Sequence, residues 1–149
     1  MYPLLLNFHN INRWIVLILG LTAAYRSYTG LSGQKEWNAL DRRWNLFFTI
    51  SMDIQFVTGL VLFFFLSPIT RSAMTQMSLI LPDREQRFFT LIHPLYMLLA
   101  MLFTHLGSLL PRKAKTSLVK YQRSAAFFTL AILCILLGMP WTRAFFPGL

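Results

Sequence analysis

The feature that most constrains this chain is a set of four long apolar stretches separated by short polar segments. They cover roughly residues 4–27, 44–67, 88–110 and 121–140. The hydrocarbon core of a bilayer is about 30 Å thick and needs about 20 apolar residues per crossing helix, so each stretch is long enough to cross. We therefore predict an all-α bundle of four transmembrane helices, which forms a single domain over residues 1–149.

Composition supports a lipid environment and limits the chemistry that the chain can perform. Hydrophobic residues make up 56% of the chain, against about 45–50% in soluble domains. The four stretches leave no room for a soluble catalytic domain. The sequence contains no Gly-rich phosphate loop, no HExxH motif and a single cysteine, Cys134, which excludes a CxxCH haem attachment. Any site must be built from helix side chains and short loops.

The basic residues are distributed unevenly between the two sides of the predicted bundle. Arg71, Arg84, Arg87 and Arg143 fall on one side, and Arg13 lies within the first stretch. The other nine fall on the opposite side: Arg26, Lys35, Arg42, Arg43, Arg112, Lys113, Lys115, Lys120 and Arg123. Cytoplasmic loops of membrane proteins are enriched in Lys and Arg. We therefore predict that both termini lie outside, on the non-cytoplasmic face.

This distribution also gives an interpretation of the net charge of +9. A balance this basic is typical either of nucleic-acid binding or of contact with an anionic membrane surface. The basic residues flank the apolar stretches and are not interleaved into a groove. We therefore assign them to topology and to contacts with membrane lipids, and we expect no nucleic-acid partner.

The loop over residues 68–87 is the longest on the outer side. Its segment 73–81 is too short to span a bilayer but apolar enough to lie on one. We predict a short interfacial helix there, ended by Pro82. Asp83 and Glu85 then favour a new helix start, so we expect the third transmembrane helix to begin near Arg84 to Arg87.

Charged or imidazole side chains inside a membrane are costly unless they are paired or face the interior, which makes each one a candidate for function. His9 and His93 lie at nearly the same depth, ~8 Å from the outer ends of their helices at a rise of ~1.5 Å per residue. Two imidazoles at matched depth on different helices are what axial ligation of a b-type haem requires. Arg13 and Arg87 could then pair with the haem propionates.

The alternative is that each of these histidines only forms a hydrogen bond to a neighbouring helix. His105 lies ~18 Å deeper than His93 on the same helix, and no other helix offers a histidine at that level. We therefore expect no second haem, and His105 is interpreted as a hydrogen-bonding or proton-handling group.

Asp53 lies near the middle of the second stretch and needs a partner. Arg13 is at a depth that its long side chain can bridge, so a buried ion pair between the two is the favoured interpretation. The alternative is a protonatable carboxyl group that serves proton or quinone chemistry.

Short motifs spread over the whole chain carry a resemblance to a known group of proteins. They are FHNINRW at 8–14, DIQ at 53–55, TGL at 58–60, RFF at 87–89 leading to His93, and HLG at 105–107. With them the chain resembles short four-helix bacterial membrane proteins described as cytochrome b-like. The resemblance implies four transmembrane helices in the bacterial inner membrane and a haem. His9, Arg13, His93 and often His105 match the pattern, whereas some members have histidine in place of Asp53.

Together these observations predict a small electron-transfer protein, with one haem b between the first and third helices near the outer face. It would exchange electrons with quinol or a periplasmic carrier. The alternative is a non-catalytic subunit or assembly factor of a respiratory or photosynthetic complex. Its partners would be other membrane subunits or copies of itself, and its polar residues would pair helices or hold a quinone, lipid or pigment. A proton-coupled transporter is disfavoured because four helices seldom enclose a path.

The predicted orientation can be tested with a cysteine introduced at Lys115, in the more basic of the loops. Because the basic loops should be cytoplasmic, a membrane-impermeant thiol reagent should label this cysteine only after the membrane is opened. Labelling from outside intact cells would reverse the orientation.

Overall fold

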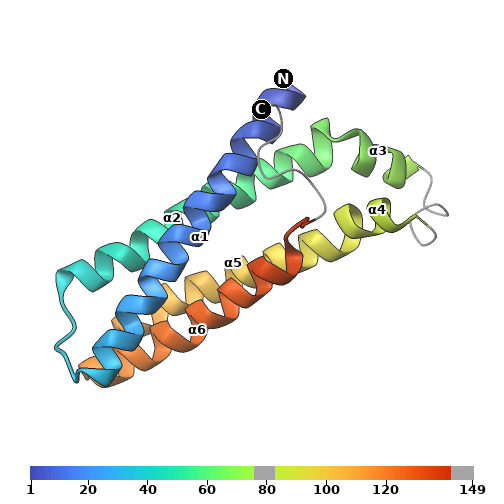
Figure 1. The fold of residues 1–149 in the computed structure, drawn as a ribbon. Coiled ribbons are helices and arrows are strands. Elements are labelled where there is room, and N and C mark those ends of the chain that lie inside the picture. Colours follow the sequence, from blue (N-terminus) through green and yellow to red (C-terminus); the bar gives the residue numbers. More distant parts are fainter. Residues whose placement is uncertain (76–82, 142–149) are drawn as a thin grey trace.

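The computed structural model describes residues 1–75 and 83–141, and within them all regular secondary structure is helical (Figure 1). Two of the four long segments are simple: α1 spans Tyr2–Ser32 and α6 spans Ser117–Gly138. In the second, α2 (Ala39–Val61) continues into a π-helix, η1 (Leu62–Leu66). The third joins α4 (Arg84–Arg87), a π-helix η3 (Phe88–Ile92), α5 (His93–Leu109) and a 3₁₀ turn η4 (Leu110–Lys113). All four are long and apolar enough to cross a membrane, so the chain is a multi-pass membrane protein.

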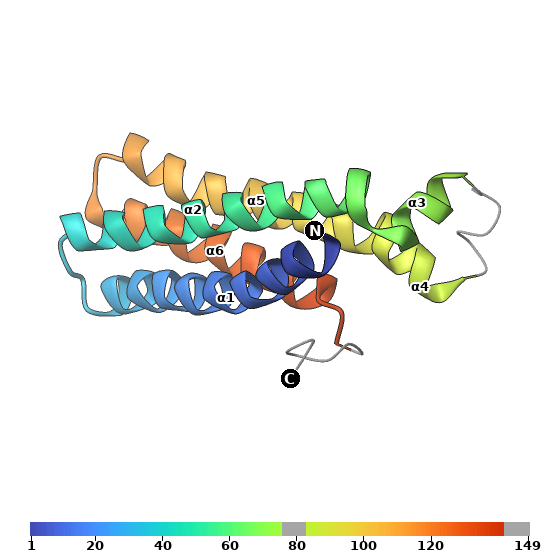
Figure 2. The same cartoon turned by 90° about the horizontal axis from the view of Figure 1, so that it is seen from above.

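The four segments run side by side, and the connections α1–α2 and α5–α6 lie together at one end of the bundle (Figures 1 and 2). Helix α1 packs against α2 and α6, and α5 packs against the same two helices. Helices α1 and α5 are therefore diagonal partners across the bundle axis. This order matters for the site, because side chains from the first and third segments can meet only through the middle of the bundle.

Small residues allow the helices to approach closely around a few buried aromatic rings. Phe48 of α2 and Phe128 of α6 are fully buried and form an edge-to-face pair with ring centroids 5.2 Å apart. A Cβ atom built on Gly20 would lie 2.8 Å from the Phe48 ring, and one built on Gly107 would lie 2.6 Å from the Phe128 ring. Helix packing in lipid relies on such close contacts. A residue larger than glycine would clash with a buried ring at either of these two positions.

The outward faces of the helices are apolar, as expected of surfaces that contact lipid. On α1 the exposed side chains Ile11, Ile15 and Ile18 follow helical spacing, while Val16 and Ala23 of the same helix are buried in the core. An apolar face of this kind would be a liability in water. In a bilayer this apolar face contacts the lipid chains.

Prolines end two of the long segments at the end of the bundle that holds the N-terminus. Ser67 precedes Pro68 and Met139 precedes Pro140, and both residues adopt extended backbone angles. Steric conflict with the proline ring disfavours the helical conformation in the preceding residue. The predicted ends near 67 and 140 are therefore close to the observed ends at Leu66 and Gly138.

At the opposite end the helices extend beyond the apolar stretches from which they were predicted. Helix α1 continues to Ser32 instead of ending near residue 27. Helix α2 begins at Ala39 because Asn38 and Asp41 form a reciprocal capping box, and α6 begins after Thr116, which caps the Val119 amide. Hydropathy locates the lipid-crossing part of a helix and does not register such polar ends.

The connection between the second and third segments contains α3 (Pro68–Thr75), whose first residue is a proline, as is common in the first helical turn. The predicted interfacial helix over 73–81 overlaps only its last turn, and residues 76–82 lie outside the described residues. The predicted start of the third segment is confirmed: Asp83 accepts a hydrogen bond from the Gln86 amide at 2.8 Å, and α4 begins at Arg84.

A buried carboxylate ties the helices together at the end that holds the two short connections. Asp41 forms a 2.6 Å ion pair with Arg26 of α1 and accepts a 2.7 Å hydrogen bond from the Tyr121 hydroxyl of α6. It also accepts from the Asn38 amide. One carboxylate thus joins three of the four segments.

Replacing Asp41 with alanine should therefore destabilise the bundle strongly. Loss of one partner from a buried pair costs on the order of 3 kcal/mol or more, because the other charge is left uncompensated. Asp83→Ala is the matched control, since Asp83 also caps a helix but is exposed, and loss of a cap costs about 1 kcal/mol. Thermal unfolding in detergent should separate the two variants, and equal losses would contradict the assigned role of Asp41.

Candidate functional site

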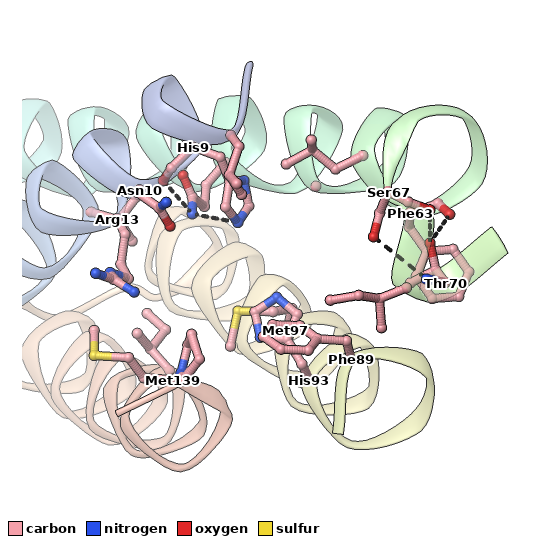
Figure 3. Close-up of a pocket in the computed structure, with 18 of the residues that line it drawn as sticks. His9, Asn10, Arg13, Phe63, Ser67, Thr70, Phe89, His93, Met97 and Met139 are labelled. Atoms are coloured by element: carbon pink, nitrogen blue, oxygen red, sulfur yellow. Dashed lines mark hydrogen bonds between the residues drawn. The ribbon is translucent and has the colours of Figure 1, made fainter. Parts of the chain in front are cut away.

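A cavity of about 280 Å³ lies inside the bundle at the end that holds α3, and all four segments contribute to its walls (Figure 3). Most of its lining is apolar, with Val16, Leu62 and Ile135 among the side chains. The polar exceptions are few: Tyr2, His9, Asn10, Arg13, Gln55, Ser67, Thr70 and His93. An apolar cavity with a few polar groups is the usual form of a small-molecule site, and its volume is near the lower limit of about 300–1,000 Å³ for such sites.

A proline shapes the wall of the cavity on the third segment. Pro94 has no amide hydrogen, so it cannot bond to the carbonyl of Thr90, and its ring crowds the preceding turn. The backbone forms a π-helical turn, Phe88–Ile92, directly before His93. Membrane helices make this kind of local adjustment around proline. π-helical turns are frequent at functional sites, and this one sets the position of His93.

His93 has one ring nitrogen engaged by the protein. Its Nδ1 lies 2.7 Å from the carbonyl oxygen of Gly138 in α6, and because a carbonyl can only accept, Nδ1 must carry the proton and donate. The remaining nitrogen, Nε2, is then an unprotonated acceptor, and no hydrogen bond to it is made within the described part of the chain. A backbone carbonyl that fixes the tautomer of a histidine in this way is typical of metal-binding histidines.

His9 has both ring nitrogens engaged. Nδ1 lies 3.2 Å from Thr58 Oγ1, whose own hydrogen is directed to the carbonyl of Ile54 or Gln55. Nδ1 therefore donates. Nε2 lies 3.0 Å from Gln55 Nε2, and the same amide group donates to the His9 carbonyl at 3.0 Å. His9 thus accepts from Gln55 at Nε2 and is neutral in this arrangement (Figure 3).

The orientation of the Gln55 amide is set by a neighbour on α1. Asn12 donates to Gln55 Oε1 at 2.9 Å and to the Ser51 carbonyl at 3.2 Å. The Gln55 oxygen must therefore face Asn12, and its nitrogen faces His9. This buried chain from Asn12 through Gln55 and His9 to Thr58 joins α1 to α2 with its donors and acceptors matched.

The two imidazoles meet across the cavity. Their ring centroids are 6.4 Å apart and the ring planes are inclined by 69°. A metal–nitrogen bond of about 2.0–2.1 Å on each side, with the distance from nitrogen to ring centre added, accounts for a separation of this size. Within residues 1–75 and 83–141 no group of three His, Cys, Asp or Glu side chains gathers to hold a metal ion. Two imidazoles at this separation without a third ligand are compatible in number with haem iron, because the porphyrin supplies the other four ligands.

Of the two arginines predicted to contact the haem, the structure brings only Arg13 to the cavity. Arg13 is 8% exposed, lines the cavity beside His9, and lies with its guanidinium carbon 5.3 Å from the centre of the Trp14 ring. Arg87 ends α4 and is not among the residues that line the cavity.

Asp53 has a different partner from the one predicted. Its Oδ1 lies 2.9 Å from His105 Nε2 on α5, so the prediction that Arg13 pairs with Asp53 is wrong. The two residues are at compatible depths, but they lie on different sides of α2: Arg13 lines the cavity, whereas Asp53 and His105 do not. The Asp53 and His105 side chains are 42% and 34% exposed and therefore lie at the outer surface of the bundle. His105 thus forms a hydrogen bond, one of the two roles predicted for it, and its role in proton handling stays a prediction.

Sequence reasoning missed the residues that hold the histidines in place. Gln55, Thr58 and Gly59 share one face of α2 at spacings of three and four residues, and a Cβ atom on Gly59 would lie 3.2 Å from the His9 ring. That spacing could have been recognised. The Gly138 carbonyl, by contrast, is a backbone group and leaves no signal in side-chain chemistry.

Searches against protein-family models, curated proteins and solved structures returned no match to this chain.

The pairing of Asp53 with His105 can be tested by a double-mutant cycle on unfolding free energy. Interhelical hydrogen bonds in membrane proteins couple by about 0.6 kcal/mol on average and up to about 1.7 kcal/mol. We expect a coupling in this range between Asp53→Ala and His105→Ala. The matched control is the cycle with Asp53→Ala and Arg13→Leu, which should show a smaller coupling. Stronger coupling of Asp53 to Arg13 than to His105 would contradict the structure.

Proposed function

We propose that the chain is a small cytochrome b-like electron-transfer protein that holds one haem b between His9 and His93. The observation that carries the proposal is the pair of imidazoles that meet edge to face at the cavity with their ring centroids 6.4 Å apart. Haem bound there would give the protein a centre that accepts and releases one electron at a time.

His93 is prepared for ligation, and His9 can become a ligand by a local exchange. The Nε2 lone pair of His93 is available because the Gly138 carbonyl fixes the proton on Nδ1. The Nε2 lone pair of His9 accepts from Gln55, so ligation requires that the Gln55 amide turn away. Its Nδ1 can keep the bond to Thr58 throughout, which leaves the tautomer unchanged.

A haem is larger than this cavity, so its entry also requires that lining side chains move. Met97 and Met139 project into the cavity (Figure 3), and methionine is among the side chains that repack most readily. Arg13 is the residue placed to pair with a propionate by a charge-assisted hydrogen bond. Arg87 would take the second propionate only if the turn between α4 and α5 rearranged.

The location of the cavity suggests where electrons would enter and leave. It lies at the end of the bundle away from the two short connections, and nine of the fourteen basic residues lie in those connections or in the helix ends beside them. We therefore place the cavity near the outer face of the bacterial inner membrane, with both termini outside. Quinol within the bilayer and a periplasmic carrier are the redox partners that such a position allows.

A second candidate function is favoured by Asp53 and His105. An ionisable pair near the middle of two membrane segments normally faces the bundle interior or a partner, whereas this pair lies on the outer surface. The third segment is also the least buried, since 11% of its most apolar stretch lies inside the bundle, against 44% for α6. Both features suit an accessory subunit of a larger membrane complex, or a homo-oligomer, in which another helix covers α2 and α5.

A reduced-minus-oxidised absorbance spectrum of the purified protein, expressed with ample haem, tests the first candidate. The wild type should show the bands of a low-spin b-type haem. His93→Ala should abolish them, because removal of one axial imidazole ends six-coordination. His105→Ala is the matched control and should keep the spectrum, since His105 contacts Asp53 outside the cavity.

Two results would overturn the haem proposal. One is a folded, haem-supplied wild type without a Soret band, which would leave the accessory-subunit candidate. The other is equal loss of the spectrum in His93→Ala and His105→Ala when both variants remain folded by circular dichroism. That result would mean that the cavity histidines have no special part in binding.

A further inference from the structure

A second recess, of about 640 Å³, opens at the opposite end of the bundle from the histidine cavity. Its walls come from the connection before α2, the first turns of α2, the end of α5 with η4, and the start of α6. The residues that line it are Trp37, Asn38, Ala39, Arg42, Asn45, Leu46, Ser108, Pro111, Arg112 and Lys120. The proposed haem site does not include this recess, whose basic residues are among those that the sequence assigned to contacts with membrane lipids.

The charge of the recess is entirely positive. Arg42, Arg112 and Lys120 line it, and no Asp or Glu is among the lining residues. Within the described part of the chain none of these three forms a salt bridge, because the ion pairs there are Arg26–Asp41 and Asp53–His105. Three cations in one recess repel one another unless an anion lies between them.

A hydroxyl group at the recess is available to a ligand. Ser108 lines the recess and is 5% exposed as a whole residue, and its hydroxyl makes no hydrogen bond to the described residues. The neighbouring Asn45 uses its amide nitrogen to bond Ser124 at 3.0 Å. The Ser108 hydroxyl can therefore donate a hydrogen bond to a ligand oxygen in the recess.

The first turn of α2 adds a favourable field. Asn38, Ala39 and Arg42 all line the recess, so the positive end of the α2 dipole adjoins it. Leu46, which is 41% exposed, lies a turn further along α2 toward the middle of the membrane. The recess therefore combines a cationic end at headgroup level with an apolar edge that leads into the bilayer.

From these features we propose that the recess binds a phosphate group, presented by the headgroup of an anionic phospholipid. Arg42 and Arg112 would hold the phosphate oxygens, since guanidinium groups match phosphate geometry. Lys120 would add a third charge, and Ser108 would donate from the recess wall. The acyl chain would follow the apolar edge at Leu46. Basic recesses between membrane helices at the cytoplasmic side recognise headgroups in this way.

The test uses the full-length protein, delipidated in a neutral detergent, and three probes: dioleoylphosphatidylglycerol, dioleoylphosphatidylcholine and inorganic phosphate. Native mass spectrometry or thermophoresis gives a dissociation constant for each. The wild type should bind phosphatidylglycerol at least tenfold more tightly than phosphatidylcholine. The double variant Arg42→Gln, Arg112→Gln should lose roughly 10–30-fold in affinity for phosphatidylglycerol, from about 1 kcal/mol per basic residue.

Two further variants separate a built site from diffuse surface charge. Lys113→Gln with Lys115→Gln removes the same charge from the same end of the bundle, but neither residue lines the recess, so affinity should stay within about twofold. Ser108→Ala leaves the charge unchanged and should weaken binding several-fold, because a hydrogen bond to a charged group is lost. Unchanged thermal unfolding confirms that each variant is folded.

Each outcome of these measurements either supports or overturns the proposed phosphate site. Strong binding of inorganic phosphate that depends on Arg42 and Arg112, without a preference for lipid, would support the phosphate site and assign it to a soluble phosphate compound. Equal losses in the two double variants, or binding that none of the variants changes, would overturn the proposal. None of these results depends on haem, so the test is independent of the proposed electron-transfer function.

Discussion

The rest of the structure depends on the fact that a bilayer offers no hydrogen bonds to the peptide backbone. Each long segment must satisfy its own carbonyl and amide groups, and a proline is the one common residue that prevents this. Pro68, Pro94 and Pro140 interrupt three of the four segments at the same end of the bundle. The cavity forms at that end, and the Gly138 carbonyl left without a helical partner accepts the bond from His93. At the other end, Asp41 joins three of the segments.

Hydropathy determined which parts of the fold could be predicted from the sequence. It located all four segments, because each crosses lipid and must be apolar along its length. It missed the polar turns that extend α1 and α2, where the helix continues into the headgroup region. It also gave the depth of each polar residue but not its rotation about the helix axis. His9 and His93 happen to face one cavity, whereas Asp53 faces away from Arg13 and meets His105 instead.

The polar groups of the membrane-spanning segments fall into two separate sets. The chain from Asn12 to Thr58 is buried between α1 and α2, and its donors and acceptors match, so it can hold the two helices in register without any ligand. The Asp53–His105 pair joins α2 to α5 but remains partly exposed on the outer surface. Matched buried networks specify one arrangement of a core, while a partly exposed ionisable pair in a membrane segment invites a partner. The first set therefore belongs to the fold, and the second is the place where we propose that another helix packs.

The same matched network has a consequence for cofactor binding. Because His9 Nε2 accepts from Gln55 and Nδ1 bonds Thr58, both nitrogens of His9 have partners within the protein. A hydrogen bond of this kind contributes about 0.5–1.5 kcal/mol, so turning Gln55 away is a small cost compared with the bond that a metal makes to imidazole. His93 presents its lone pair without any such exchange. Ligation would therefore begin at His93 and be completed by His9, which makes His93 the residue on which the first encounter with a cofactor depends.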